Sequence, residues 1–387
     1  MSFRKVVFLR YLPLTQKISK DFYFEEISAS GIKVEYWDVS FLLTGISQIE
    51  DYRSDVVRKF SSYSEISRVL KGIDRKSTLF VLIMTYNGDV LHLYSILSKY
   101  KCILSVFGKN MFPTAPFSKS SVLVSSKFTI KLLRKILLNK MSVLAKKYHF
   151  VKNYDILFLA GKNGASGIGR VTREELIKSQ KISINSDDYD RFFLEFNQHN
   201  CRSYRYAVFL DEYLPLHQDL ELVGLKAINA KDYYDSLNKL FSEIEAYYGV
   251  RVIIAAHPKA VRYKTEDFFD GREVAWGETA TLCNNCEFVL AHDSTSINYA
   301  VLSGKPIISL ISDDIINTSP VIADSIKAFS EYLHTPIVNI DRPRIDNFTL
   351  GICNESYTNY KYDFLTSLES ENKRTVDVLI EFLHNDK

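Results

Sequence analysis

Short runs of apolar residues alternate along the chain with segments in which apolar residues recur at helical spacing. The apolar runs of the first half are Lys5–Leu9, Ile32–Trp37, Thr78–Thr85, Cys102–Phe107 and Asp155–Leu159. Helical spacing separates them, as in Ile18–Ile27 and Val90–Lys99. Buried strands that alternate with helices favour a parallel sheet with crossover connections. We therefore expect residues 1–190 to form one α/β domain.

The same alternation continues in the second half of the chain. Its apolar runs are Tyr206–Leu210, Val252–Ala256, Phe288–Ala291 and Pro306–Leu310, with a helical segment at Tyr233–Tyr248. We expect a second α/β domain over residues 191–370 and a C-terminal helix within 371–387. A length of 387 residues suits two such domains.

Composition narrows the classes of protein that fit. Hydrophobic residues make up 46% and charged residues 25%, as in ordinary globular proteins. The net charge of +3 is too small to indicate a nucleic-acid partner. The start has no signal peptide, and no apolar run has the length of a membrane span, so we expect a cytoplasmic protein. The cysteines are scattered and indicate reduced thiols; they are Cys102, Cys201, Cys283, Cys286 and Cys353.

The segment 119–152 is rich in basic residues and contains no acidic residue. Its cations are Lys119, Lys127, Lys131, Arg134, Lys135, Lys140, Lys146, Lys147 and Lys152. Leucine, isoleucine and valine lie among them at near-helical spacing. Such a basic amphipathic helix can rest on an anionic membrane surface, which would place the protein at the inner face of the membrane. The alternative is a surface helix with a solvated basic face.

A glycine-rich loop follows the apolar run that ends at Leu159. Residues 160–170 read AGKNGASGIGR, which matches neither a Walker loop nor a dinucleotide fingerprint. Glycines allow the backbone to approach a ligand closely. We expect the start of this loop near the cleft, namely Gly161, Lys162 and Asn163.

Two carboxylates follow the run Tyr206–Leu210 directly. These are Asp211 and Glu212. Open parallel sheets bind their ligands at the carboxyl ends of the strands. A carboxylate there can take a proton from an acceptor hydroxyl or attack a sugar carbon as a nucleophile. The structural alternative is an acidic loop or a helix cap.

Two groups suited to an anion follow later apolar runs. The first, after Val252–Ala256, consists of His257, Pro258 and Lys259. The second, after Phe288–Ala291, consists of Asp293, Ser294, Thr295 and Ser296. An imidazole, an ammonium group, hydroxyls and the unpaired amides of a helix start all suit a phosphate. A buried structural histidine and simple helix capping are the alternatives. A carboxylate pair with two anion-binding groups describes a site for a nucleotide-activated sugar.

The order of these motifs resembles that of bacterial GT-B glycosyltransferases that use CMP-activated acidic sugars, the sialyltransferase-like and Kdo-transferase-like families of surface polysaccharide assembly. Those families carry an acidic pair followed by glycine, then a His-Pro motif, then a serine/threonine pair. The matching positions are Asp211-Glu212, His257-Pro258 and Ser294–Ser296. Tyr213 stands where those families have glycine.

The resemblance implies a GT-B-like α/β fold, in which two Rossmann-like domains with parallel sheets face a central cleft. It implies an N-terminal acceptor-binding domain and a C-terminal domain that binds the nucleotide sugar. His257 and the Ser294–Ser296 hydroxyls would hold the CMP phosphate, and Asp211 would be the catalytic carboxylate. Transfer would need neither metal nor cofactor. The sugar would be Kdo or sialic-acid-like, and the acceptor a surface glycan or lipid-linked glycan of capsule, O-antigen or lipooligosaccharide.

Other functions also fit the pattern. A GT-B-type enzyme can use a UDP-, GDP- or dTDP-sugar, or epimerise one. A non-catalytic partner in glycan assembly would have the same fold without needing the carboxylates. A phosphoester hydrolase is disfavoured because the sequence shows no convincing cluster of metal ligands. The sequence leaves open whether transfer inverts or retains the anomeric configuration.

Overall fold

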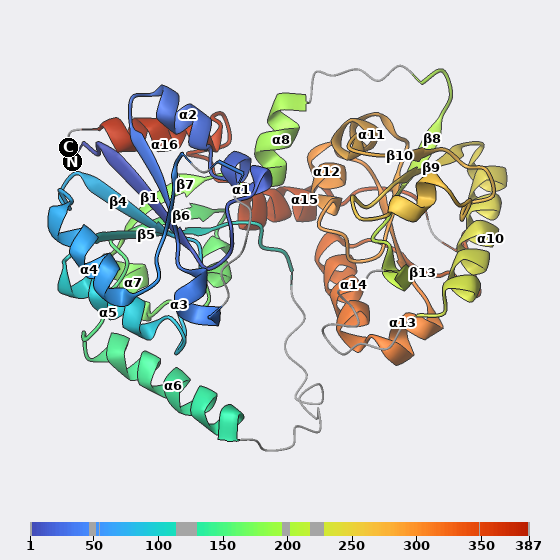
Figure 1. Cartoon of the computed structure of the whole chain (residues 1–387). Coiled ribbons are helices and arrows are strands. Elements are labelled where there is room, and N and C mark those ends of the chain that lie inside the picture. The colour runs from blue at the N-terminus through green and yellow to red at the C-terminus, as the bar shows by residue number, and fades with distance from the viewer. Residues whose placement is uncertain are drawn as a thin grey trace. The chain divides into compact units, whose positions relative to one another are not determined.

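A computed structural model divides the chain into two compact units, each built on a parallel sheet (Figure 1). It describes residues 2–45, 52–53, 55–113, 130–195, 202–216, 228–347 and 349–385. Unit 1 comprises Met1–Met111, Ser125–Asp187 and Thr366–Lys387, and unit 2 comprises Phe112–Val124 and Asp188–Leu365. The units thus divide after Asp187 and Leu365, whereas the sequence pattern placed boundaries after 190 and 370.

The sheet of unit 1 has seven parallel strands in the order β3-β2-β1-β4-β5-β6-β7. Their bounds are β1 Lys5–Arg10, β2 Lys33–Asp38, β3 Val57–Lys59, β4 Thr78–Leu82, β5 Ile103–Gly108, β6 Ile156–Ala160 and β7 Gln180–Ile184. The interior strand β4 is buried at every position because both faces of the sheet carry an apolar cluster.

Helices cover both faces of this sheet. They are α1 Gln16–Asp21, α2 Phe24–Ala29, α3 Ser40–Thr44, α4 Tyr63–Gly72, α5 Leu91–Lys99, α6 Ile130–Lys147, α7 Arg173–Lys178 and α16 Thr375–His384. The expected C-terminal helix is α16, and it packs within unit 1, where the Phe382 ring meets those of Phe3 and Phe158. In the described part of the chain, none of the helices combines the length and apolar character that crossing a bilayer demands.

The sheet of unit 2 has six parallel strands in the order β10-β9-β8-β11-β12-β13. Their bounds are β8 Tyr206–Leu210, β9 Arg251–Ala255, β10 Val274–Ala275, β11 Val289–Ala291, β12 Ile307–Ile311 and β13 Ile337–Asn339. The helices are α8 Asp187–Glu195, which begins at the last residue of unit 1, α10 Ala230–Tyr248, α11 Thr279–Asn285, α12 Ile297–Leu302, α13 Asp313–Thr318, α14 Pro320–Leu333 and α15 Asn354–Tyr360. Two Rossmann-like parallel sheets confirm the fold class expected from the sequence.

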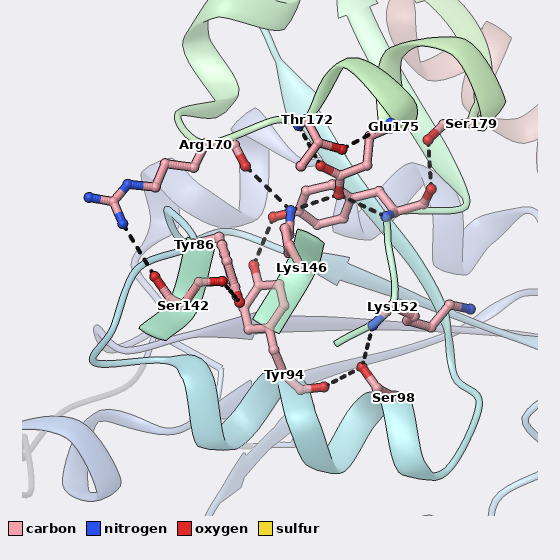
Figure 2. A network of polar contacts seen from close by, with 11 residues as sticks. Tyr86, Tyr94, Ser98, Ser142, Lys146, Lys152, Arg170, Thr172, Glu175 and Ser179 are labelled. Atoms are coloured by element: carbon pink, nitrogen blue, oxygen red, sulfur yellow. Dashed lines mark hydrogen bonds and ion pairs between the residues drawn. The ribbon is translucent and has the colours of Figure 1, made fainter. Parts of the chain in front are cut away.

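A buried ion pair fixes α6 to the rest of unit 1 (Figure 2). Lys146 Nζ lies 2.6 Å from Glu175 Oε1, and the two side chains are 2% and 0% exposed. Glu175 also accepts the Tyr154 N–H and completes the capping box that starts α7 at Thr172. Burial lowers the pKa of Lys146, and the Glu175 carboxylate opposes that shift. One carboxylate thus joins α6, α7 and the loop before β6.

Because removal of one partner leaves the other charge buried and unpaired, Glu175→Gln should lower the free energy of unfolding of unit 1 by about 3–5 kcal/mol. The neighbouring carboxylate in Glu174→Gln is the matched control, since its partner Lys178 is solvent-exposed, and it should leave the transition unchanged. Trp37 and Trp276 are the only tryptophans and lie in different units. Urea unfolding followed by Trp37 fluorescence in a Trp276→Phe background measures the stability of unit 1. Equal effects of Glu175→Gln and Glu174→Gln would contradict the stabilising role of the buried ion pair.

Candidate functional site

The site predicted from the sequence lies at the carboxyl edge of the unit 2 sheet. Strand β8 pairs with both β9 and β11, so that Leu210 is in register with Ala255 on one side and Ala291 on the other. All three strands are parallel, and the residues that follow them therefore emerge at one edge. The structure thus brings together the segments that begin at Asp211, His257 and Asp293.

Asp211 ties the loops after β8 and β9 to each other. One carboxylate oxygen accepts hydrogen bonds from the Tyr213 N–H (3.1 Å) and the Tyr263 hydroxyl (3.2 Å). The other accepts one from the His257 N–H (3.3 Å). The residue is only 5% exposed, and burial raises the pKa of its carboxyl group to about 6, although these donors favour the ionised form. Asp211 is therefore largely ionised near neutral pH.

Tyr213, which stands where the resembling families have glycine, has an unusual backbone conformation. Its φ of 57° lies in the left-handed region, where glycine is favoured and a tyrosine is strained. The backbone at this position keeps the conformation that a glycine would adopt most easily. The hydrogen bond from the Tyr213 N–H to Asp211 and the packing of its ring on Tyr263, with centroids 5.2 Å apart, hold it there.

Glu212 and Asp293 form a carboxyl pair between the loops after β8 and β11. The Asp293 N–H donates to Glu212 Oε2 at 3.4 Å, and the two side chains hydrogen-bond to each other. Burial and the negative charge of Asp293 raise the pKa of Glu212 well above its ordinary value, and burial also raises that of Asp293. Two neighbouring carboxylates of this kind retain a shared proton at pH values where isolated ones have lost theirs.

The His257–Lys259 segment forms a tight turn after β9. The Lys259 N–H donates to His257 Nδ1 at 3.2 Å, which fixes the orientation of the ring. Pro258 and Lys259 are exposed, and His257 is half-buried. The segment therefore presents an imidazole and an ammonium group at the carboxyl edge, next to the loop of Asp211.

The segment after β11 differs in detail from the expected anion site. Ser294 Oγ accepts the Ser296 N–H at 3.3 Å, and the N–H groups of Ile297, Asn298 and Tyr299 donate to carbonyls within the turn. Ser296 is the N-cap of α12 but makes no side-chain cap, so neither Asp293 nor Ser294 caps the helix. Ser294 is buried, whereas Thr295 is exposed and Ser296 half-exposed. The hydroxyls of Thr295 and Ser296 are therefore better placed to meet a ligand than the amides.

His292 has a structural role that the sequence did not predict. The residue is fully buried directly after β11. Its Nδ1 lies 2.8 Å from the Leu310 carbonyl oxygen and must carry the proton, so Nε2 accepts from the Tyr233 hydroxyl at 2.9 Å. Burial lowers the pKa of this imidazole to about 4. The neutral ring links β11, β12 and α10 below the carboxyl pair.

Tyrosines around Asp211 are a second feature that the sequence did not reveal. Tyr263 donates to Asp211 and lies 2.7 Å from the hydroxyl of Tyr234. Burial and the Asp211 charge raise the pKa of Tyr263 far above its ordinary value, so it stays a donor. Tyr263 also lines a surface cavity of about 650 Å³ beside β10, together with Phe268 and Trp276. The composition, with 24 tyrosines among 387 residues, is the only feature of the sequence that points to this tyrosine cluster.

The glycine-rich loop lies in unit 1, at the carboxyl end of β6. Gly161 has a φ of 65°, and Lys162 and Asn163 are exposed. A Cβ atom on Gly164 would lie 2.6 Å from the Gly108 carbonyl oxygen, so that glycine is needed for packing against β5. The loop therefore has a structural reason for part of its glycine content, and a place of Gly161–Asn163 in ligand binding stays a prediction.

The cysteines have no redox or metal-binding arrangement within the residues that are described. Cys102, Cys283 and Cys286 are buried free thiols, and burial raises the pKa of each. Such thiols behave as small apolar side chains. Across the described ranges, no group of three or more His, Cys, Asp or Glu residues has a geometry that would hold a metal ion. Cys201 lies outside the described residues.

The pKa of His292 has a consequence for stability. The unfolded chain binds a proton at this residue below about pH 6.5, whereas the folded chain resists it down to about pH 4. As the pH falls between these values, His292 takes up a proton in the unfolded chain but not in the folded one. This difference should lower the free energy of unfolding by roughly 3 kcal/mol.

Urea unfolding followed by Trp276 fluorescence in a Trp37→Phe background reports unit 2. The difference between the parent and His292→Asn should shrink as the pH falls from 6.5 to 4. His334→Asn replaces an exposed histidine in the same unit at a φ of 54°, which asparagine tolerates, and is the matched control. A pH-independent difference for His292→Asn would refute the buried neutral imidazole.

No protein-family model and no curated protein matches this chain. Among solved structures, it is similar to a variant of the wall teichoic acid polymerase TagF soaked with CDPG, with a TM-score of 0.51 and 11% identity, over 99% of this chain and 89% of that one. It is also similar to the glycosyltransferase SnogD from Streptomyces nogalater, with a TM-score of 0.46 and 10% identity over 99% of both chains. For the UDP-GlcNAc 2-epimerase of Methanocaldococcus jannaschii the TM-score is 0.40, with 13% identity over 92% of this chain and 97% of that one. The likeness to TagF shows that the chain has the GT-B fold, with two Rossmann-like domains.

Proposed function

We propose that this protein is a GT-B-type glycosyltransferase that takes a sugar from a nucleotide-activated donor. The observation that carries the proposal is the meeting of carboxyl groups, an imidazole and hydroxyls at one edge of the unit 2 sheet. These groups come from the ends of β8, β9 and β11, the neighbouring central strands. The GT-B fold of the chain is compatible with this activity but does not by itself determine it.

The phosphate of the donor would lie against the loops after β9 and β11. His257 and Lys259 supply cationic or hydrogen-bonding nitrogens, and the hydroxyls of Thr295 and Ser296 supply donors. The amides at the start of α12 contribute little, because they donate within the turn. Stabilisation of the leaving phosphate by such side chains is the reason that we expect transfer without a metal ion.

The carboxyl groups would divide the proton chemistry between them. Asp211 is ionised near neutral pH and is the proposed catalytic carboxylate, which takes the proton of the acceptor hydroxyl. Glu212 and Asp293 hold a shared proton and can give it up as negative charge develops nearby. A pair of sites whose surroundings favour opposite protonation states is a general arrangement for acid–base catalysis.

The donor that we propose is a CMP-activated acidic sugar of the Kdo or sialic acid class. Support comes from the order of Asp211-Glu212, His257-Pro258 and Ser294–Ser296, and from the left-handed backbone at Tyr213, a conformation that glycine adopts easily. The proposed acceptor is a surface glycan or a lipid-linked glycan.

A second candidate is epimerisation of a nucleotide sugar by the same site. The observation in its favour is the Glu212–Asp293 pair, because a carboxyl pair with a shared proton can remove and return a proton at a sugar carbon. Incubation of a UDP-, GDP- or dTDP-sugar with the protein in D2O separates the two functions. Deuterium in the recovered sugar indicates epimerisation, and transfer to an acceptor leaves the sugar without it.

The donor class is tested by the thermal stability of unit 2 with CMP, CDP, UDP, GDP or dTDP, each with EDTA. CMP should stabilise the protein, by about 2.7 kcal/mol when its concentration is a hundred times its Kd. His257→Ala should abolish most of this effect, whereas His334→Ala, at an exposed histidine of the same unit, should preserve it. If another nucleotide stabilises the protein and CMP does not, the donor carries that nucleotide. Stabilisation by none of them would overturn the proposal.

The proton chemistry is tested by the pH dependence of transfer. The rate should fall as the pH drops through about 6, because Asp211 then takes up a proton. Asp211→Asn should reduce kcat by about 10²–10⁴-fold while CMP still binds. Glu212→Gln should remove the decline at high pH that follows loss of the shared proton.

Glu266→Gln, at an exposed carboxylate of unit 2, is the matched control and should keep both limbs of the profile. Full turnover by Asp211→Asn together with inactivity of Glu212→Gln would assign the catalytic carboxylate to Glu212. Full turnover by both variants would remove the carboxyl groups from the mechanism.

A further inference from the structure

Helix α6 is attached to unit 1 through its polar side (Figure 2). Asn139 Oδ1 accepts the Gly88 N–H at 2.9 Å, and the Ser142 carbonyl accepts the Tyr86 hydroxyl at 2.8 Å. One turn further along, Lys146 pairs with the buried Glu175. Residues 139, 142 and 146 share one side of a helix, and that side faces the protein.

The opposite side of α6 exposes large apolar residues. The exposed fractions are Leu133 53%, Ile136 41%, Leu137 59%, Met141 47%, Val143 49% and Leu144 49%, followed after the helix by Tyr148 60% and Phe150 77%. Leu137, Met141 and Leu144 fall on one helical face. A helix on the surface of a soluble domain normally has the reverse arrangement, with its apolar side against the core. Single exposed apolar residues need no explanation, but a continuous set does.

The orientation of α6 is fixed by close backbone packing as well as by polar bonds. A Cβ atom on Gly88 would lie 2.6 Å from the backbone carbonyl carbon of Leu138. The loop after β4 therefore touches the helix backbone directly. A helix held by backbone contact, two hydrogen bonds and a buried ion pair cannot turn Leu133, Leu137 and Leu144 inward without losing all of these.

The charges on α6 are of one sign. The helix has no acidic residue, and among its residues 133–147, whose side chains are described, the exposed cations are Arg134, Lys135, Lys140 and Lys147. Lys146 is the one cation of its C-terminal half that is turned inward, where Glu175 pairs with it. The surface thus combines apolar side chains, cations and two terminal aromatic residues, the composition of helices that lie in a membrane interface.

We propose that α6 docks on an anionic membrane, with its axis along the bilayer surface and Leu137, Met141 and Leu144 in the acyl boundary. Arg134, Lys140 and Lys147 would meet the lipid headgroups, and Tyr148 and Phe150 would anchor the end of the helix. Charge complementarity selects an anionic bilayer as the occupant. The inference goes beyond the proposed function, because it concerns unit 1 and none of the donor-binding residues.

The structure refines the membrane segment expected from the sequence in two ways. Lys146 and Lys152 are engaged with Glu175 and Asp155 within unit 1, so Lys146 is an anchor of the helix and not a lipid contact. The apolar side chains, and not the cations alone, face outward. The part of the segment before residue 130 lies outside the described residues.

Co-sedimentation of the full chain with vesicles tests the proposal. The protein should bind vesicles that contain phosphatidylglycerol at least tenfold better than vesicles of phosphatidylcholine alone, and salt should weaken this preference. Leu137→Ser/Leu144→Ser should reduce binding to anionic vesicles at least tenfold. Lys140→Glu/Lys147→Glu should abolish the preference for phosphatidylglycerol.

Leu368→Ser is the matched control, because it removes a 75% exposed leucine of unit 1 that is not part of α6, and it should bind like the parent. Absence of binding to anionic vesicles at low salt, or equal binding by all variants, would overturn the proposal. So would a dimer in size-exclusion chromatography that Leu137→Ser/Leu144→Ser dissolves, since the occupant would then be a second copy of the chain. The response of each variant to CMP is measured in parallel, so that loss of the proposed function is distinguished from loss of membrane docking.

Discussion

The parallel pairing of β8 with β9 and β11 is the constraint on which the candidate site depends. Leu210 is in register with Ala255 and Ala291, so the three strands end at the same level of the sheet. The three segments of the site, which begin at Asp211, His257 and Asp293, are far apart in sequence, and this register brings them together. Asp211 then closes the arrangement, because its carboxylate accepts the His257 N–H from the adjacent loop.

The two kinds of carboxyl group at this edge behave differently because their partners differ. Asp211 is surrounded by hydrogen-bond donors, which limit the rise of its pKa that burial causes. Glu212 faces another carboxyl group, which adds to the effect of burial. The same local sequence thus places two neighbouring carboxyl groups, Asp211 and Glu212, in surroundings that shift their pKa values by different amounts. A neutral His292 below them avoids a buried positive charge that would pull both pKa values down.

The sequence predicted the strands of both sheets where apolar runs were long, as in β4 and β9, and it predicted which residues follow them. It missed β3, β10 and β13, which have three, two and three residues and too few positions for a periodic signal. It also predicted a phosphate site at the amides of α12. Those amides are engaged because α12 starts with a tight turn, in which they donate to backbone carbonyls and the Ser294 hydroxyl accepts the Ser296 N–H.

Helix α6 shows most clearly what a sequence pattern leaves undetermined. Its amphipathic spacing specifies that one side is apolar and another polar, but not which of them faces the protein. That choice is made by Glu175, which lies 29 residues after Lys146, and by Gly88, which lets the helix backbone approach. Desolvation of Lys146 is tolerated only because Glu175 is equally buried and also caps α7. With its charged anchor inside, the helix must leave Leu133, Leu137 and Leu144 outside, and this inversion follows from long-range contacts alone.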